Sequence, residues 1–275
     1  LFEQAFGEEW VDEGMGLAGR PPLDLRVNTL KADRQKVLAD LAPLGARATA
    51  IAPHGIRIAP IEGDGRHPNV QAEPAFQKGW FEVQDEGSQI VAELAAAAPG
   101  MQVLDYCAGA GGKTLALSAA MGNHGQVFAH DAEKARLAPI FDRLRRSDNR
   151  NVQVVSKPSE LAPLAGRMDL VVVDAPCTGS GTWRRRPDAK WRLTQRQLDQ
   201  RQAEQAAILD TAAAFVKPGG LLAYITCSVF EAENAAQTAA FCGRAPGFAP
   251  VDHEALWAGR FPAHENAARI DGAGA

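Results

Sequence analysis

The spacing of apolar residues changes several times along the chain, and each change marks an expected element. Apolar and polar residues alternate from Leu23 to Asn28, which is the pattern of a half-buried strand. Residues 32–44 instead carry their apolar side chains at helical spacing, on one face. Two short strands are predicted at 48–52 and 55–59, around a Pro-His-Gly turn. Residues 1–79 are therefore predicted to form a small α+β domain with the order β-α-β-β.

Beyond Met101 the pattern becomes a regular alternation of strands and helices. The predicted strands are 102–106, 126–130, 152–155, 168–173 and 221–226, and the predicted helices are 82–98, 112–121, 133–146, 194–216 and 231–241. Such alternation indicates an α/β fold with a doubly wound, mostly parallel sheet. We therefore expect residues 80–275 to form a Rossmann-like domain behind a small N-terminal domain with ferredoxin-like features.

Two of the predicted strands lead to a cysteine. Residues 170–173 are apolar and mostly β-branched, which indicates a strand buried on both faces, and Asp174 and Cys177 follow it. The strand that begins at Leu221 leads in the same way to Cys227. In open α/β sheets the ligand crevice lies outside the carboxyl ends of the strands, so these side chains are candidate site residues. A strand with an ordinary glycine-rich turn is the structural alternative.

Composition narrows the class of protein. Charged residues make up 23% of the 275 residues and the formal net charge is −4, which argues against a generic nucleic-acid coat protein. Four cysteines without paired spacing do not form a disulfide framework, so we expect a reducing, cytoplasmic location. We expect no metal, no membrane contact and a monomer. The chain begins at Leu1 without Met, which suggests a piece of a longer protein.

A glycine-rich turn follows the first strand of the main domain. A P-loop would need glycine where Cys107 stands, and a dinucleotide fingerprint would need glycine where Thr114 stands. An adenosyl cofactor such as S-adenosylmethionine needs only a close backbone approach here and an acidic residue after the next strand, where Asp131 stands. A nicotinamide or nucleotide site, or a structural turn with Lys113 in solvent, are the alternatives.

Methylation of cytosine at carbon 5 needs a thiol nucleophile, an acidic group and a further group for release, and the sequence offers two thiols and a carboxylate. Carbon 5 of cytosine becomes nucleophilic only after a thiolate adds to carbon 6 while an acidic group holds N3, and a further group then helps to release the adduct. Cys227, Asp174 and Cys177 are of these types. A redox pair is a weaker alternative because C-x-x-C is missing. Cys107 and Cys242 fit small buried hydrophobic residues.

Six motifs carry a family resemblance over about residues 20–245. They are Asp174-Ala-Pro-Cys177, Thr226-Cys227-Ser228, Cys107-Ala-Gly-Ala-Gly-Gly-Lys-Thr114, Phe81-Glu-Val-Gln-Asp-Glu86, Arg184-Arg-Arg-Pro-Asp-Ala-Lys-Trp191 and Arg26-Val-Asn28. Together they resemble the Fmu/Sun-type (NOL/NOP/sun) RNA cytosine-C5 methyltransferases. The resemblance implies Cys227 as the covalent nucleophile, Cys177 as the release residue and Asp174 as the partner of N3. Enzymes that act on DNA use the Pro-Cys thiol instead, which would exchange the two cysteine roles.

The same resemblance implies S-adenosylmethionine as the cofactor. The residues it places against this cofactor are Cys107, Ala108, Gly109, Ala110, Gly111, Gly112, Lys113, Asp131 and Asp174. Three features depart from the family pattern. Gly109-Ala110 stands where the family has Ala-Pro, and Val155-Ser-Lys-Pro158 stands where an Asp for adenine is expected. Asp271-Gly272 is followed by only three residues, which suggests a truncated C-terminus.

Basic residues with interleaved tryptophans follow the Cys177 loop. The residues expected to bind RNA are Arg184, Arg185, Arg186, Lys190, Trp191 and Arg192, with Trp183 beside them. This composition fits phosphate contacts and stacking on an unpaired base, although a charge run is ordinarily a solvated face. Arginines of the predicted helix 133–146 would extend the basic surface. We expect ribosomal RNA as the partner, with residues 1–79 also in contact with it.

Two rival functions stay open from the sequence. A nicotinamide-dependent oxidoreductase would use the same glycine-rich turn and Asp131, and titration with S-adenosylhomocysteine and with NAD separates it from a methyltransferase. A catalytically silent RNA-binding module would bind RNA tightly without transferring a labelled methyl group.

Overall fold

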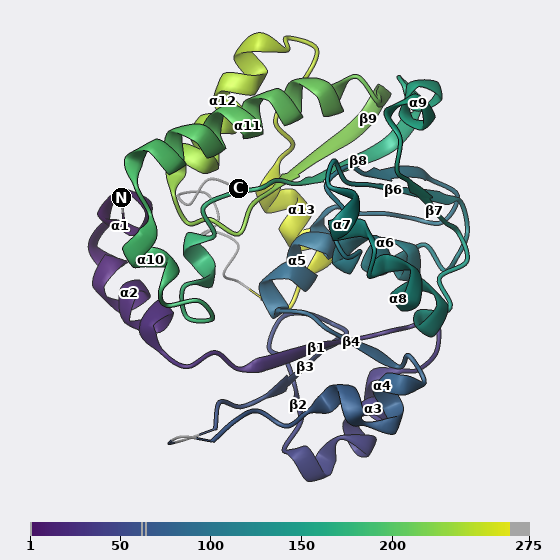
Figure 1. Cartoon of the computed structure of the whole chain (residues 1–275), viewed down its shortest axis with the longest axis vertical. Coiled ribbons are helices and arrows are strands. Elements are labelled where there is room, and N and C mark those ends of the chain that lie inside the picture. Colours follow the sequence, from purple (N-terminus) through teal and green to yellow (C-terminus); the bar gives the residue numbers. More distant parts are fainter. Residues whose placement is uncertain (1, 62, 64, 265–275) are drawn as a thin grey trace. The chain divides into compact units, whose positions relative to one another are not determined.

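Strands and helices alternate through the main part of the chain, as the pattern predicts. The computed structural model describes residues 2–61, 63 and 65–264, and within these residues five strands form one sheet in the order β7-β6-β5-β8-β9 (Figure 1). The strands are β5 (Gln102–Asp105), β6 (Gln126–His130), β7 (Val152–Val155), β8 (Met168–Asp174) and β9 (Val216–Ile225). The pairs β5–β6, β6–β7 and β5–β8 are parallel, which confirms the doubly wound α/β class.

The order of this sheet turns round at β5. From β5 the chain first adds β6 and β7 on one side and then β8 and β9 on the other. In sheets of this class ligands bind outside the carboxyl ends of the strands where the order reverses. The turn that follows β5 is therefore a favoured position for a ligand.

A second, antiparallel sheet has the order β2-β3-β1-β4. Its strands are β1 (Leu23–Val27), β2 (Arg47–Ala48), β3 (Gly55–Ile58) and β4 (Phe81–Val83), and helix α3 (Arg34–Asp40) joins β1 to β2. Its core is fully apolar and includes Leu25, Val27, Val37, Leu41, Ile56 and Phe81. The predicted helix over 82–98 is wrong at its start, because β4 pairs with β1 and α5 (Glu86–Leu94) begins only after Asp85, whose carboxylate accepts a hydrogen bond from the Gly87 N–H.

The chain divides into two units. The first, which we call the sheet unit, comprises Pro22–Val172 and Phe215–Leu221. The second comprises Leu1–Pro21, Val173–Ala214 and Leu222–Ala275, and we call it the thiol unit because it holds Cys177 and Cys227.

Helices of the sheet unit follow the parallel strands. They are α6 (Gly112–Ala120), α7 (Lys134–Leu137), α8 (Ile140–Ser147) and α9 (Pro158–Leu161), and the short α4 (Pro74–Gln77) precedes β4. The single helix predicted over 133–146 is divided into α7 and α8, and Pro139, which has no N–H to donate, stands at the division.

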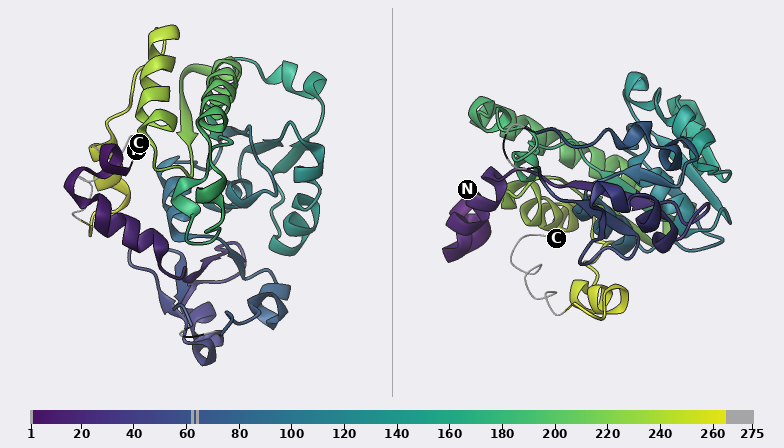
Figure 2. Two further views of the ribbon diagram at one scale, coloured as in Figure 1. Left: turned by 60° about the vertical axis from the view of Figure 1, so that its left-hand side comes forward. Right: turned by 90° about the horizontal axis from the view of Figure 1, so that it is seen from below.

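The thiol unit is mainly helical. Its helices are α1 (Phe2–Phe6), α2 (Trp10–Ala18), α10 (Ala189–Arg192), α11 (Gln195–Ala213), α12 (Ala235–Arg244) and α13 (His253–Arg260). Thr194 begins α11 with a capping box, since its side chain and that of Gln197 each bind the other's backbone N–H. Helices α11 and α12 lie side by side (Figure 2). The helix predicted to reach Val216 ends at Ala213, and β9 begins at Val216, five residues before the start predicted for that strand.

Two further observations bear on the expected partners. Among the described residues no helix has the length and apolar character needed to cross a bilayer. Over the same residues there is no group of three or more His, Cys, Asp or Glu side chains arranged to hold a metal ion. Asp271-Gly272, on which the expectation of a truncated C-terminus rests, lies outside the described residues.

Candidate active site

The two predicted thiols lie together in the thiol unit. The Ala175 N–H, just after β8, donates to the Ile225 carbonyl at the end of β9, at 2.8 Å. Beyond this bond the segments that follow β8 and β9 continue side by side, and the Sγ atoms of Cys177 and Cys227 are 3.3 Å apart. Asp174 is the last residue of β8, three positions before Cys177.

Close packing of the two loops depends on glycine. The Gly181 N–H donates to the Cys227 carbonyl at 3.0 Å, and a Cβ at Gly181 would lie 3.0 Å from that same oxygen. Gly179 has a φ of +70°, in the left-handed region that glycine adopts most readily. The Ser180 and Ser228 hydroxyls are 3.0 Å apart and join the loops a second time. The Thr-Gly-Ser-Gly sequence after Cys177 is therefore what lets the loops approach.

The two thiols have different surroundings. Cys227 is exposed, whereas Cys177 is partly buried. The hydrogen bond to Cys227 raises the pKa of the Cys177 thiol, and burial raises it further. Both causes favour the protonated form of Cys177. Of the two sulfurs, that of Cys227 belongs to the more exposed residue.

The glycine-rich turn lies in the sheet unit, between β5 and α6. Gly109 and Gly111 have φ values of +50° and +85°, and a Cβ at Gly111 would lie 2.5 Å from the Ile140 side chain. No other residue type fits Gly111 without displacing that side chain. Lys113 is 8% exposed and donates to the Ser88 hydroxyl at 3.3 Å, so the alternative of a solvated Lys113 is wrong.

Asp131 follows β6 and connects directly to this turn. Its Oδ2 accepts a hydrogen bond from the Gly109 N–H at 2.9 Å, and its Oδ1 accepts one from the Glu133 N–H at 2.9 Å. Arg136 is 3.6 Å from Oδ2. Each carboxylate oxygen has room for a second donor, so Asp131 still has acceptor capacity for two ribose hydroxyls. The glycine turn and this carboxylate thus fit an adenosyl group.

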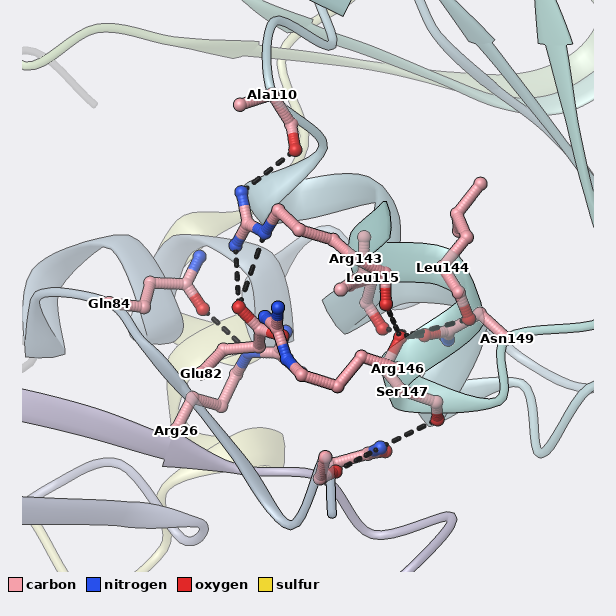
Figure 3. Close-up of polar contacts among 12 residues, drawn as sticks. Arg26, Glu82, Gln84, Ala110, Leu115, Arg143, Leu144, Arg146, Ser147 and Asn149 are labelled. Carbon is pink, nitrogen blue, oxygen red and sulfur yellow. Dashed lines mark hydrogen bonds and ion pairs between the residues drawn. The ribbon is translucent and has the colours of Figure 1, made fainter. Parts of the chain in front are cut away.

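A buried ionic network supports the turn from below (Figure 3). Arg143 donates through Nη1 to the Ala110 carbonyl at 2.8 Å and through Nε and Nη2 to Glu82 Oε2 at 3.2 and 3.0 Å. Arg146 pairs with the other oxygen of Glu82, which is 3% exposed. The arginines of the predicted helix 133–146 were expected to extend the basic surface. Arg143 and Arg146 instead direct their guanidinium groups to Glu82.

The Arg26-Val-Asn28 motif belongs to the same support. The Arg26 Nε donates to Gln84 at 2.6 Å, and burial lowers the pKa of Arg26 to about 10, still well above neutrality. Asn28 donates to the Gly79 and Ser147 carbonyls at 2.9 and 2.7 Å. The motif therefore fastens β1 to the end of α8.

The predicted RNA-binding residues form an exposed segment of the thiol unit. Trp191 is 81% exposed, and the Lys190 Nζ lies 4.9 Å from the centre of its ring. Arg185, Arg186 and Arg192 are exposed, while Arg184 and Lys190 are partly buried. Trp183 differs, because it stacks on Phe2 at 5.5 Å and meets Phe230 edge-on at 5.9 Å. Trp191, and not Trp183, has a ring face open to a base.

Sequence reasoning did not find the residues that hold these loops. Glu82 was assigned to a helix, and Glu233 and Asn234 were placed in the first turn of another. Glu82 and Glu233 act through partners more than fifty positions away, such as Arg143 for Glu82 and Thr178 for Glu233. Asn234 acts through Thr226 and Ser228, which are only eight and six positions away, but nothing in the local pattern distinguishes it from an ordinary helix residue.

The known proteins that this chain resembles include ribosomal RNA methyltransferases. The family model described as 16S rRNA methyltransferase RsmB/F matches residues 92–256, and the one described as the ferredoxin-like domain of RsmF/B-like methyltransferases matches residues 1–61. The probable ribosomal RNA small subunit methyltransferase B of Synechocystis sp. is 34% identical over 248 residues, which are 88% of this chain and 54% of that protein. The chain thus spans about half the length of the curated relatives it matches.

Two solved structures resemble the chain over most of its length. The crystal structure of PH0851 has a TM-score of 0.80 and 32% identity, covering 88% of this chain and 56% of that one. A methyltransferase homologue protein from Pyrococcus horikoshii has a TM-score of 0.73 and 28% identity, covering 86% of this chain and 74% of that one.

Proposed function

The chain belongs to the RsmB/F family of 16S rRNA methyltransferases, and from that premise we propose that it methylates carbon 5 of a cytosine in ribosomal RNA through a covalent intermediate. Family membership confirms the resemblance to the Fmu/Sun-type enzymes. The observation that carries the proposal is the pair of thiols 3.3 Å apart after β8 and β9. Hydride transfer to or from a nicotinamide does not itself require a pair of thiols.

The exposed Cys227 is the nucleophile in this proposal. Its thiolate adds to carbon 6 of the cytosine while Asp174 holds N3, and the electrons displaced from the ring make carbon 5 nucleophilic. Cys177 donates its hydrogen bond to the Cys227 sulfur before attack, which stabilises the thiolate. Any base must leave a helical stack before it can reach the thiolate, so this step does not select cytosine. The selection of cytosine therefore depends on the groups that contact the edge of the pyrimidine ring.

Cys177 is the release residue. The hydrogen bond to the Cys227 thiol, the first cause of the raised pKa of Cys177, is lost once the Cys227 sulfur is bonded to carbon 6, while burial remains. Cys177 then loses its proton to solvent and accepts the proton from carbon 5. The electrons of that C–H bond restore the ring double bond, and the bond from carbon 6 to Cys227 breaks. The thiol pair therefore carries both covalent steps.

The turn after β5 holds the cofactor in this proposal. S-adenosylmethionine, when bound, supplies an electrophilic methyl group. The backbone of residues 107–113 faces the cofactor in a turn that needs the positive φ values of Gly109 and Gly111. Asp131, which already accepts a hydrogen bond from the Gly109 N–H, also accepts hydrogen bonds from the ribose hydroxyls. The family resemblance assigns Asp174 to the cofactor as well as to the base. Trp191 and the arginines of residues 184–186 bind the RNA around the target nucleotide.

Replacement of each cysteine by alanine tests the proposal. Cys227→Ala should abolish methyl transfer and any covalent adduct. Cys177→Ala should still attack and transfer, and then remain joined to RNA through Cys227. Denaturing electrophoresis with labelled RNA and S-adenosylmethionine should show a protease-sensitive shifted band for Cys177→Ala alone.

Three results would contradict the proposal in different ways. An adduct in Cys227→Ala but not in Cys177→Ala would make Cys177 the nucleophile, as in enzymes that act on DNA. Full activity in both variants would exclude cytosine-C5 chemistry. Tight RNA binding without methyl transfer by the unaltered protein would identify a silent RNA-binding module.

A further inference from the structure

One short turn of the thiol unit contacts both cysteine loops. This turn is a 3₁₀ segment, Glu231–Glu233, followed directly by Asn234. Glu233 is fully buried and Asn234 nearly so. Neither residue carries a step of the proposed reaction, and neither was expected from the sequence to belong to the site.

Glu233 holds the loop that carries Cys177. Its Oε1 accepts a hydrogen bond from the Thr178 N–H at 2.9 Å, and its Oε2 accepts one from the Thr178 hydroxyl. Gln205, which is also fully buried, donates to Glu233 Oε1 at 2.9 Å and to the Pro176 carbonyl at 3.1 Å. The residues on both sides of Cys177 are therefore tied to the Glu233 carboxylate.

Asn234 holds the loop that carries Cys227 in the same manner. Its Oδ1 accepts a hydrogen bond from the Thr226 hydroxyl at 2.6 Å, and its Nδ2 donates to the Ser228 carbonyl at 2.9 Å. The residues on both sides of Cys227 are thus tied to the Asn234 amide. Two consecutive residues fix two loops that lie about fifty positions apart in the sequence.

We propose that Glu233 and Asn234 are positioning residues that set the distance between the two thiols. The proposal rests on the proposed function, since it assigns each residue to one covalent step. Glu233 places Cys177 for the release step, and Asn234 places Cys227 for the attack. Without Glu233 the loop of Cys177 can move and the release step slows, while Cys227 stays in place. Without Asn234 the loop of Cys227 can move and the attack slows, while Cys177 stays in place.

The distance can be tested without RNA or cofactor. Diamide oxidises two neighbouring thiols to a disulfide and takes up their two protons and two electrons, at a rate that depends on how often the sulfurs meet. Formation of the Cys177–Cys227 disulfide, followed by peptide mass spectrometry, should be at least tenfold slower in Glu233→Ala and in Asn234→Ala. Glu233→Gln should stay near the unaltered rate, because its amide oxygen still accepts from the Thr178 N–H and the Thr178 hydroxyl can accept from its NH₂.

Glu231→Ala is the matched control, because Glu231 lies in the same turn and is exposed. Its disulfide rate should equal that of the unaltered protein. If Glu233→Ala does not fold, as judged by thermal unfolding, Thr178→Val replaces it, since valine keeps the shape of threonine and loses one bond to Glu233. A rate in Asn234→Ala and in Glu233→Ala (or Thr178→Val) equal to or faster than that of the control overturns the proposal.

A single-turnover assay with labelled S-adenosylmethionine and RNA then assigns the steps. Glu233→Ala should transfer the methyl group and accumulate the covalent adduct, as expected for Cys177→Ala. Asn234→Ala should lose adduct and product together. The same ratio of adduct to product in both variants overturns the division of roles. If the unaltered protein transfers no methyl group, the proposed function fails, while the disulfide rates still decide whether the two residues set the thiol distance.

Discussion

The turn after β5 and the loop after β8 are built on opposite plans. In the first, the side chains are small and the backbone faces the ligand, and the support beneath is ionic: Glu82 with Arg143 and Arg146. In the second, the side chains are those proposed to perform the chemistry, and the support is the buried Glu233 carboxylate and Gln205 amide, which bind N–H, hydroxyl and carbonyl groups. Each support lies far along the chain from the turn that it holds.

The two plans should fail in different ways. Removal of one member of a buried ion pair leaves the remaining charge without a partner in a poorly solvated place, at a cost of about 3–5 kcal/mol. The groups that Glu233 and Asn234 bind are neutral, so removal of either residue costs about 1–3 kcal/mol and leaves no unpaired charge behind. Damage to the first support should therefore appear as lost stability, and damage to the second as a misplaced catalytic group.

The largest expected effect is on stability. Glu82→Gln leaves the guanidinium groups of Arg143 and Arg146 without their carboxylate and should lower the free energy of unfolding by about 3 kcal/mol or more. Urea unfolding measures the change. Asp142→Asn is the matched control, because it breaks the exposed pair with Arg145 and should cost less than about 1 kcal/mol. Equal losses in the two variants would mean that the buried pair gives no special support.

A smaller effect is expected on cofactor binding. Asp131→Ala removes the acceptor of the ribose hydroxyls and the acceptor of the Gly109 N–H, and should weaken binding by about 1–3 kcal/mol. Calorimetric titration with S-adenosylhomocysteine measures it, with NAD as the competing ligand class. Glu133→Ala, which alters an exposed acid two residues later, should bind as the unaltered protein does. Unchanged affinity in a folded Asp131→Ala would refute the ribose assignment.

The smallest effect is expected at the exposed segment of the thiol unit, where solvent screens the charges. Replacement of Arg184, Arg185 and Arg186 by alanine should weaken RNA binding and lower the slope of log K against log salt by about 2, since each phosphate contact on a single strand contributes about 0.7. Cofactor affinity should not change. Arg150→Ala with Arg167→Ala removes exposed arginines of the sheet unit and serves as the control. An unchanged slope in the triple variant would make the run an ordinary solvated face.

The difference between the two regions also explains what the sequence could predict. Both turns and both thiols were predictable, because glycines, cysteines and the strands before them are neighbours in the chain. The supports were not, because Glu82 and Arg143 are 61 residues apart and Thr178 and Glu233 are 55 apart. Local periodicity holds no information about such partners. The three-residue strand β4 has the same limit, since only its pairing with β1 distinguishes it from the start of a helix.

Hybrid proteins assembled from two relatives would have to respect β4. A crossover just before Phe81 would force β4 of one parent to pair with β1 of the other, through the Arg26 and Glu82 positions that lie opposite each other. A crossover just after β4 would instead set Glu82 of one parent against Arg143 of the other. Neither crossover point keeps both the pairing of β1 with β4 and the ion pair of Glu82 with Arg143 within one parent. The segment that recombines as a block in this fold therefore runs from β1 to the end of α8, so the small sheet and the floor of the cofactor turn are inherited together.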